Sequence, residues 1–306
     1  MNICILESLS SINPNGVIDA HVRQAITLTR YLQQQGHDVC LLDGDSMQGF
    51  SRKNLDVIIK SYASFYENHE DAKRIVEANP SAKLFWLINE YDLNINGNWR
   101  RFAKSRGLSV IANFPDKRDL FNQHFMVNMN ALFYRDDRDI PSKKYDICYY
   151  GTYRKNRAVY FKKYFCDKSI FLSTSSKNHK KFRGIGCEFT PVDKFKWSGK
   201  YDTLGYFKYS LYIEDVHTHK LFNNLADRFY EALSNKTVIV FDRSCENTLD
   251  KSEIAGFGWQ DFIVDSLDDI KNRDYDKDIK AQQKWIPVVK AEKENALKTL
   301  ETIITQ

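Results

Sequence analysis

Hydrophobic residues recur along the chain in two spacings, and their succession predicts strands that alternate with helices. Short apolar runs with polar ends predict buried strands, whereas apolar residues three and four positions apart predict amphipathic helices. The predicted strands are residues 2–6, 38–42, 55–60, 83–88, 108–111, 146–150, 169–172, 210–213, 237–241 and 262–264, and the predicted helices are 18–35, 70–78, 158–165, 267–272 and 279–305. This alternation is typical of α/β proteins with parallel sheets.

The clearest unit is residues 221–242, where one amphipathic helix leads directly into one buried strand. Arg228 and Glu231 lie three apart on that helix, so both side chains project from the same side. One interpretation is a surface ion pair that contributes about 0.5 kcal/mol. The other is a functional pair, in which the cation binds a diphosphate and the carboxylate binds ribose hydroxyls.

A second candidate site follows the strand at 146–150. Gly151 permits close approach of the backbone, Thr152 offers a hydroxyl, and Arg154 and Arg157 place two cations where the next helix begins. Helix N-termini favour anions through their unpaired N–H groups. The alternative is that these arginines are simply solvated.

The periodicity fades and charges gather between residues 125 and 144, which predicts a domain junction there. We expect domains at 1–140 and 141–280, followed by a helix at 281–306 that packs back on the first domain. The sequence contains neither a G-x-G-x-x-G fingerprint nor a Walker loop. No apolar tract is long enough to cross a bilayer, so no membrane partner is expected.

The charge is distributed unevenly around a mild net value of +5. Residues 143–200 hold fifteen Lys and Arg against four Asp and Glu, and a second basic cluster adjoins Trp99. Such clusters suit polyanions, although a solvated surface is the commoner meaning of basic runs. Six scattered cysteines suggest neither a metal site nor a disulfide framework and are typical of a reducing cytoplasm.

Glu90 follows the predicted strand at 83–88, at the edge of the sheet where working residues usually lie. It is a candidate general base, with an ordinary loop carboxylate beside Asp92 as the alternative. No metal site is predicted. The triplet at 43–45 (Asp-Gly-Asp) is interpreted as a turn, and His217 and His219 as part of a loop that binds no metal.

Three blocks resemble the GT-B glycosyltransferases and, among them, the DNA β-glucosyltransferases of T-even bacteriophages, which glycosylate 5-hydroxymethylcytosine. The first is residues 145–157 (YDICYYGTYRKNR), which resembles the strand and donor-phosphate loop of that family. The second is the helix carrying Arg228 and Glu231, and the third is residues 84–93 (LFWLINEYDL). The resemblance implies two Rossmann-like parallel-sheet domains that face a cleft, with the C-terminal helix crossing back to the first domain.

The resemblance also implies an inverting displacement that transfers a sugar from a UDP-sugar, with Glu90 as the catalytic base. The donor-binding residues it implies are Gly151, Thr152, Tyr153, Arg154, Arg157, Arg228 and Glu231. The family base is an Asp, so a Glu here has a longer reach. Asp19 and His21 both lie near the position of a first-domain residue that contacts the sugar, and this choice stays open. A divalent metal is compatible with the chemistry but is required by no motif.

The acceptor implied by the resemblance is double-stranded DNA with hydroxymethylated bases, and a base inside a duplex must be flipped out of the stack. The residues predicted to bind nucleic acid are Phe65, Tyr66, Trp99, Arg100, Arg101, Lys104 and Arg106. Aromatic residues in the position of 65 and 66 more often pack under the neighbouring helix, and this is the alternative. A monomer in the cytoplasm of a phage host is expected. The alternatives are a GT-B enzyme acting on a bacterial surface polysaccharide or protein, and a non-catalytic nucleic-acid-binding module.

Overall fold

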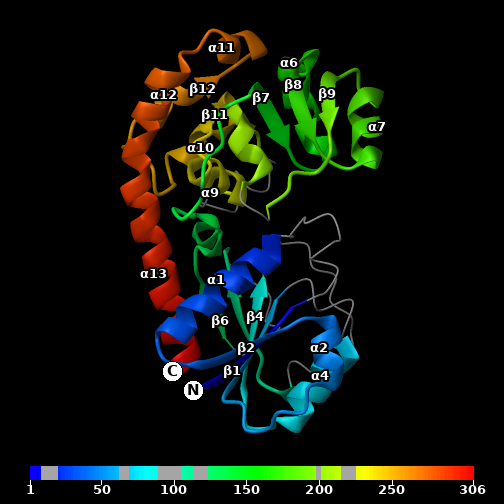
Figure 1. Ribbon diagram of the computed structural model, residues 1–306, viewed down its shortest axis with the longest axis vertical. Coiled ribbons are helices and arrows are strands. Elements are labelled where there is room, and N and C mark those ends of the chain that lie inside the picture. The colour runs from blue at the N-terminus through cyan, green and yellow to red at the C-terminus, as the bar shows by residue number, and fades with distance from the viewer. Residues whose placement is uncertain (8–19, 62–68, 89–104, 114–122, 198–200, 215–224) are drawn as a thin grey trace. The chain divides into compact units, whose positions relative to one another are not determined.

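The computed structural model describes residues 1–7, 20–61, 69–88, 105–113, 123–197, 201–214 and 225–306. The described chain forms two compact units (Figure 1). The first contains the described residues up to 133 together with Lys293–Gln306, and the second contains Tyr134–Glu292. The junctions therefore fall at 133/134 and 292/293, compared with the predicted 140/141 and 280/281.

The first unit is built on a six-stranded sheet in which every neighbouring pair of strands is parallel. The strand order is β2-β1-β3-β4-β5-β6, so the order reverses between β1 and β3. The strands are β1 (Asn2–Leu6), β2 (Asp38–Leu42), β3 (Val57–Ser61), β4 (Lys83–Ile88), β5 (Ser109–Ala112) and β6 (His124–Met126), and the helices are α1 (Ala20–Gln34), α2 (Gly44–Gly49) and α4 (His69–Ala78).

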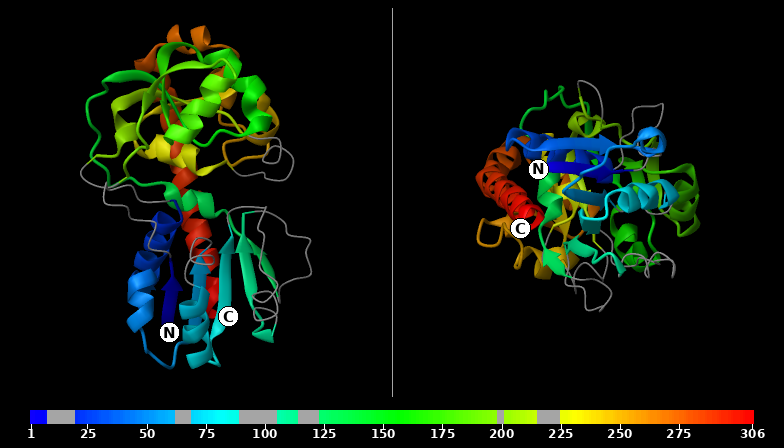
Figure 2. Two further views of the ribbon diagram at one scale, coloured as in Figure 1. Left: turned by 90° about the vertical axis from the view of Figure 1, so that its right-hand side faces the viewer. Right: turned by 90° about the horizontal axis from the view of Figure 1, so that it is seen from below.

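One face of this sheet carries the main core, because alternate strand residues point to the same side. Ile3, Ile5, Val57 and Ile59 form a buried cluster with apolar residues of α1 and of the last helix, α13 (Ile286–Thr305). The C-terminal part of α13 thus belongs to the first unit (Figure 2), as predicted from the sequence. A hydrogen bond of 2.9 Å from the Tyr31 hydroxyl to Glu301 also joins α1 to α13.

The second unit repeats the plan with the strand order β12-β11-β10-β7-β8-β9, again with every pair parallel. The order reverses between β7 and β10, the two central strands. The strands are β7 (Tyr145–Tyr150), β8 (Cys166–Ser173), β9 (Glu188–Val192), β10 (Phe207–Tyr212), β11 (Val238–Asp242) and β12 (Ile263–Val264), and the main helices are α6 (Ala158–Tyr164), α7 (Ser176–Gly184), α9 (Asp227–Ser234), α11 (Leu267–Lys271) and α12 (Tyr275–Gln282).

Aromatic side chains fill the core of the second unit. Tyr149 meets Phe161 and Phe165 edge to face at centroid distances of 5.4 and 5.7 Å. A separate group joins Phe229 and Phe241 to Trp285, with centroids about 6 Å apart. Such edge-to-face and tilted pairs stabilise the fold beyond the burial of their area. The rings fix the ends of β7 and α9, which carry the predicted donor-binding residues.

Most predicted elements are confirmed, including the strands at 2–6, 38–42 and 83–88 with the same bounds. The prediction of one helix over 279–305 is wrong, because the 3-10 turn at Gln283–Trp285 separates α12 from α13. The prediction of a turn at 43–45 is also wrong, since Asp43 caps α2 by accepting a 3.0 Å hydrogen bond from the Ser46 N–H. The elements α7, β6 and β9 were not predicted.

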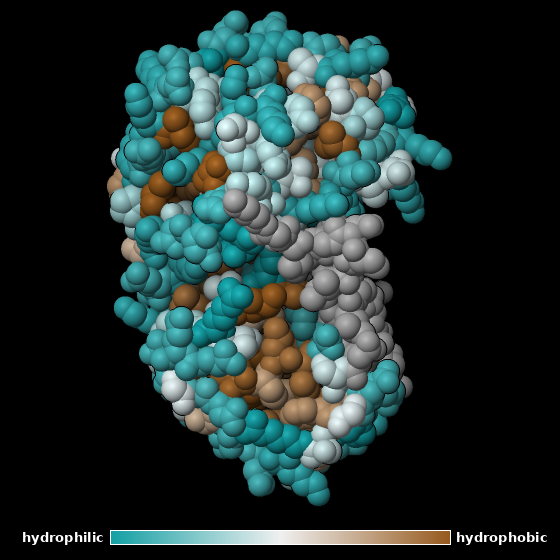
Figure 3. Space-filling model, in the orientation of Figure 1, coloured by the Kyte–Doolittle hydropathy of each residue, from teal (hydrophilic) through white to brown (hydrophobic). Residues whose placement is uncertain are grey.

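Hydrophilic side chains cover most of the face drawn in Figure 3, and hydrophobic side chains gather in one area of the first unit. Among the described residues, no helix has the length and apolar character needed to cross a membrane.

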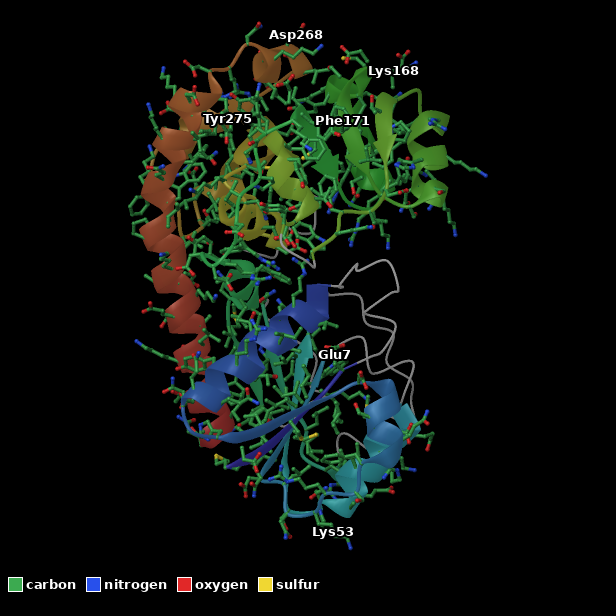
Figure 4. All side chains as sticks on the ribbon, in the orientation of Figure 1. Glu7, Lys53, Lys168, Phe171, Asp268 and Tyr275 are labelled. Atoms are coloured by element: carbon green, nitrogen blue, oxygen red, sulfur yellow. The ribbon has the colours of Figure 1, made fainter. Side chains whose placement is uncertain are left out.

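Two charged side chains are buried where the strand order of the first sheet reverses. Glu7 directly follows β1 and is labelled in Figure 4, and Lys60 lies on β3 in register with Leu6. They are 2% and 5% exposed. Burial lowers the pKa of Lys60 from its ordinary 10.5 to about 7, although the charge of Glu7 opposes the change. Lys60 therefore releases its proton far more readily in the folded protein than in the unfolded chain.

We expect Lys60→Met to change how stability depends on pH. Between pH 7 and 10 the unfolded chain binds a proton that the folded protein has released, so unfolding takes up a proton. The Lys60 contribution to the free energy of unfolding then rises with pH by up to about 1.4 kcal/mol per unit. Urea unfolding at several pH values should show this rise in the wild type and in the exposed control Lys53→Met, and its loss in Lys60→Met. Equal slopes in all three proteins would contradict the assignment.

Candidate functional site

The candidate site lies where β7 and β10 end, at the point where the strand order of the second sheet reverses. In open α/β sheets, ligands bind beside the carboxyl ends of strands at such points. Gly151 follows β7, Arg157 follows one short turn later, and Glu214 lies just beyond β10. Helix α9 adds Arg228 and Glu231. The topology therefore brings together residues that are up to 80 positions apart in sequence.

Two arginines share one carboxylate at the centre of this site. The Arg157 Nη2 lies 3.2 Å from one oxygen of Glu214, and the Arg228 Nη2 donates to the other oxygen. Both Nη1 groups donate to the hydroxyl of Tyr149, at 3.4 and 3.3 Å. All four side chains are buried, and the three charged residues are at most 8% exposed. This is a buried ionic cluster, not a group of solvated surface arginines.

The guanidinium of Arg228 is held from several sides. It lies over the rings of Tyr149 and Tyr212, with centroid distances of 5.7 and 5.4 Å. Its Nη1 is also 3.4 Å from the carbonyl oxygen of Tyr150. Burial opposes its charge, but Glu214 together with Tyr149, Tyr212 and Asp227 outweighs this effect and raises the pKa of Arg228 well above its ordinary value. Arg228 is thus a permanent cation with a fixed orientation.

Glu231 lies in a neighbouring polar contact on the same helix. Its carboxylate accepts a 2.7 Å hydrogen bond from the Tyr150 hydroxyl, and the residue is only 2% exposed. Burial, together with the charge of Glu231, raises the pKa of Tyr150 well above its ordinary value, so the hydroxyl remains a donor. The alternative of a solvated surface pair between Arg228 and Glu231 is therefore excluded by their burial.

Two constraints favour glycine at position 151, which are its backbone conformation and the close approach of the Arg228 side chain. Its φ of +147° is rarely adopted by L-residues, and a Cβ atom there would lie 3.0 Å from the Arg228 Nη1. The glycine thus lets the guanidinium pack directly against the loop after β7. Its predicted part in binding the donor stays a prediction.

The other predicted donor-binding residues lie in the same loop with different surroundings. Thr152 and Arg154 are exposed. The Tyr153 ring packs against Phe182 at a centroid distance of 5.3 Å and against Phe161 at 6.2 Å. Among the described contacts, only Arg157 and Arg228 of the three predicted arginines join the cluster around Glu214. The roles of Thr152, Tyr153 and Arg154 stay predictions.

Glu214 is the residue that sequence reasoning missed. No role was assigned to it from the sequence, although it directly follows the predicted strand at 210–213. A carboxylate that follows an apolar strand in a parallel sheet, two βα units from a run of arginines, was the available signal. Only the three-dimensional structure shows that one carboxylate bridges both cations.

The predicted acceptor-side residues are mostly outside the described residues: Glu90, Phe65, Tyr66, Trp99, Arg100, Arg101, Lys104 and Asp19. The side chain of His21 is not described either, and His217 and His219 also lie outside the described ranges. Arg106 is described, and it donates to the carbonyl oxygens of Asn79 and Pro80 at 3.3 and 2.8 Å. It precedes β5, so it lies toward the amino edge of the sheet. Its proposed contact with nucleic acid stays a prediction.

No described group of three or more His, Cys, Asp or Glu residues could hold a metal ion.

No protein-family model matches the sequence, and no curated protein matches it significantly.

Solved structures show a clear likeness over the whole length of this chain. The β-glucosyltransferase of phage T4 in complex with UDP-glucose is 15% identical with a TM-score of 0.67, and both chains are covered completely. A second structure of DNA-modifying β-glucosyltransferase is 13% identical, with a TM-score of 0.66 and the same complete coverage. An α-glucosyltransferase in complex with UDP and a 13-mer DNA containing an HMU base is 12% identical, with a TM-score of 0.60, and is also covered completely. The predicted GT-B fold is confirmed.

Gly151→Ala should disturb the site through Arg228. The added methyl group strains the backbone by roughly 1–3 kcal/mol and displaces the Arg228 guanidinium. Gly186→Ala is the matched control, because Gly186 also has a positive φ (+83°) but nothing lies within 4 Å of its added Cβ. Both variants should unfold at lower temperature, and only Gly151→Ala should also lose affinity for inorganic pyrophosphate, measured by calorimetry. Equal pyrophosphate affinity in the two variants would contradict this account.

Proposed function

We propose that the chain is a glycosyltransferase that moves a sugar from a UDP-sugar to the hydroxyl of 5-hydroxymethylcytosine, or a related hydroxymethylated base, in phage DNA. The observation that carries the proposal is the buried arginine pair at the reversal point of the second sheet, with Glu231 beside it. The pair occurs in a fold that matches a UDP-glucose-bound phage enzyme over its full length.

The chemical roles follow from the charges of the side chains. Arg157 and Arg228 would stabilise the negative charge that grows on the diphosphate as the sugar leaves, a preorganised electrostatic effect. Glu231 would accept hydrogen bonds from the ribose hydroxyls. Glu90 would take the proton of the acceptor hydroxyl while that oxygen bonds to the anomeric carbon. The bond from the anomeric carbon to the phosphate oxygen breaks, its electron pair leaves with UDP, and the configuration inverts.

Two parts of the proposal go beyond the shared fold: inversion at the anomeric carbon and the identity of the modified base in the DNA. The similar structures are named for opposite anomers, α and β, so the shared fold is compatible with either stereochemical outcome. The GT-B scaffold is likewise compatible with a bacterial polysaccharide or protein as acceptor. For this reason the acceptor needs a direct test.

The deciding experiment offers the purified protein a panel of UDP-sugars with hydroxymethylcytosine DNA, unmodified DNA and a bacterial polysaccharide. Nucleoside mass spectrometry should detect a glycosylated base only with the hydroxymethylated DNA, and NMR of the product should show the inverted anomer. Transfer to the polysaccharide but never to DNA would favour the surface-polymer alternative. Binding of UDP without transfer to any acceptor would favour a non-catalytic module.

Glu90→Gln should reduce transfer by about 10²–10⁴-fold, because the amide cannot accept the proton. Its affinity for UDP should be nearly unchanged, since Glu90 belongs to the other unit. Glu77→Gln, an exposed carboxylate on α4, is the control and should transfer at the wild-type rate. Transfer by Glu90→Gln at the wild-type rate would show that another group is the base.

Glu231→Gln should separate recognition of the ribose from recognition of the diphosphate. The variant keeps an oxygen that accepts from Tyr150 but loses the charge that would bind two ribose hydroxyls. We expect UDP to bind about tenfold more weakly, while inorganic pyrophosphate, which has no ribose, binds as before. Calorimetric titration with both compounds makes the comparison, and a parallel loss of pyrophosphate affinity would reject the ribose role.

A further inference from the structure

The carboxylate of Glu214 lies between Arg157 and Arg228 and is shared by both guanidinium groups. Each of its oxygens is bonded to a different guanidinium, through Nη2 of Arg157 and Nη2 of Arg228. Glu214 is only 2% exposed, so these contacts are shielded from bulk solvent. This is the geometry that a phosphate group adopts when two arginines bind it together.

The Nη1 group and the faces of the Arg228 guanidinium are already engaged. Its Nη1 lies close to the hydroxyl of Tyr149 and to the carbonyl oxygen of Tyr150, and the ring faces of Tyr149 and Tyr212 cover the cation. An anion that takes the position between the two Nη2 groups displaces the carboxylate of Glu214 from at least one of them. The donor diphosphate and Glu214 are competitors for the same N–H groups.

We propose that Glu214 is an internal counter-ion of the donor site, which limits the affinity for the diphosphate and so makes tight binding depend on the nucleoside. This inference rests on the proposed function, because it takes the arginine pair as the diphosphate site. Glu214 is neutralised by the arginines in the free protein and is displaced from at least one of them when the diphosphate binds. A bare anion such as pyrophosphate therefore binds more weakly than UDP, which brings additional contacts.

The charge balance supports this role. Two cations and one carboxylate leave a net charge of about +1, whereas a nucleoside diphosphate brings two or more negative charges at neutral pH. Removing the carboxylate would leave two adjacent buried cations without the anion that they share. Such a pair is unfavourable in a low-dielectric interior and would bind any available anion more tightly.

Glu214→Gln tests the inference with simple ligands. Gln has nearly the same shape but no charge, so the free variant should unfold at a temperature lower by about 5–10 °C. UDP and inorganic pyrophosphate should both bind about tenfold more tightly than to the wild type, because the same displacement cost is removed for each. Uridine, which has no phosphate, should bind as it does to the wild type.

Asp167→Asn is the matched control. It also removes one carboxylate from an ion pair in the second unit, because Asp167 lies 2.6 Å from the Nζ of Lys271, but that pair is partly exposed to solvent. Its affinity for UDP and pyrophosphate should equal that of the wild type. Saturating pyrophosphate should raise the melting temperature of Glu214→Gln more than that of the wild type or of this control.

The outcomes separate the inference from the function on which it rests. Unchanged or weaker pyrophosphate binding by folded Glu214→Gln would overturn the counter-ion role and leave the donor site standing. A wild-type protein that binds neither UDP nor pyrophosphate would overturn the donor site itself. Glu214→Asp keeps the charge with a shorter reach, so it should bind pyrophosphate with an affinity between those of the wild type and Glu214→Gln. If Glu214→Gln does not fold, an affinity of Glu214→Asp at or below the wild-type value rejects the proposal.

Discussion

The second unit depends on one electrostatic constraint, which is the burial of two guanidinium groups next to each other. Like charges in a protein interior repel strongly, and loss of one partner from a buried ion pair typically costs about 3–5 kcal/mol. Glu214 offsets this repulsion, and the hydroxyl of Tyr149 accepts from both arginines. Aromatic packing around Tyr149 in turn fixes that hydroxyl. A core of rings thus orients a cluster of charges.

The two sheets place charged residues at corresponding positions. Each sheet has one point at which the strand order reverses, and each point carries a buried acid and at least one buried base. In the first unit these are Glu7 and Lys60, and in the second they are Glu214 with Arg157 and Arg228. At such points the loops after two neighbouring strands lead away from each other and leave a crevice. A ligand can contact polar groups in that crevice while the strands stay paired.

The sequence predicted the fold well because both units follow simple periodic rules. Strands such as 83–88 are continuous apolar runs, as expected when both faces of a parallel sheet are covered. The weaker elements were missed for physical reasons, since α7 is rich in lysine and β9 contains Pro191, so neither has a clear apolar period. The break before α13 was missed because Gln283–Trp285 continues the helical pattern while forming a tighter turn.

The candidate site was predictable in part. Gly151, Arg157, Arg228 and Glu231 could be found because each follows a strand or faces one side of a helix. Glu214 was not assigned, because its partners come from the short turn after β7 and from helix α9, and its sequence context is an ordinary strand end. Pairing between distant segments depends on strand order, and a single sequence does not reveal strand order.

The position of α13 has a consequence for the order of folding during synthesis. Leu300 and Ile304 pack in the core of the first unit with Ile3 and Ile5, yet they are made after the whole of the second unit. On the ribosome the unit encoded second can therefore complete its core first. Until α13 emerges, the apolar face of the amino-terminal sheet is covered only in part, by α1, and such exposed apolar surface makes a nascent chain prone to aggregation.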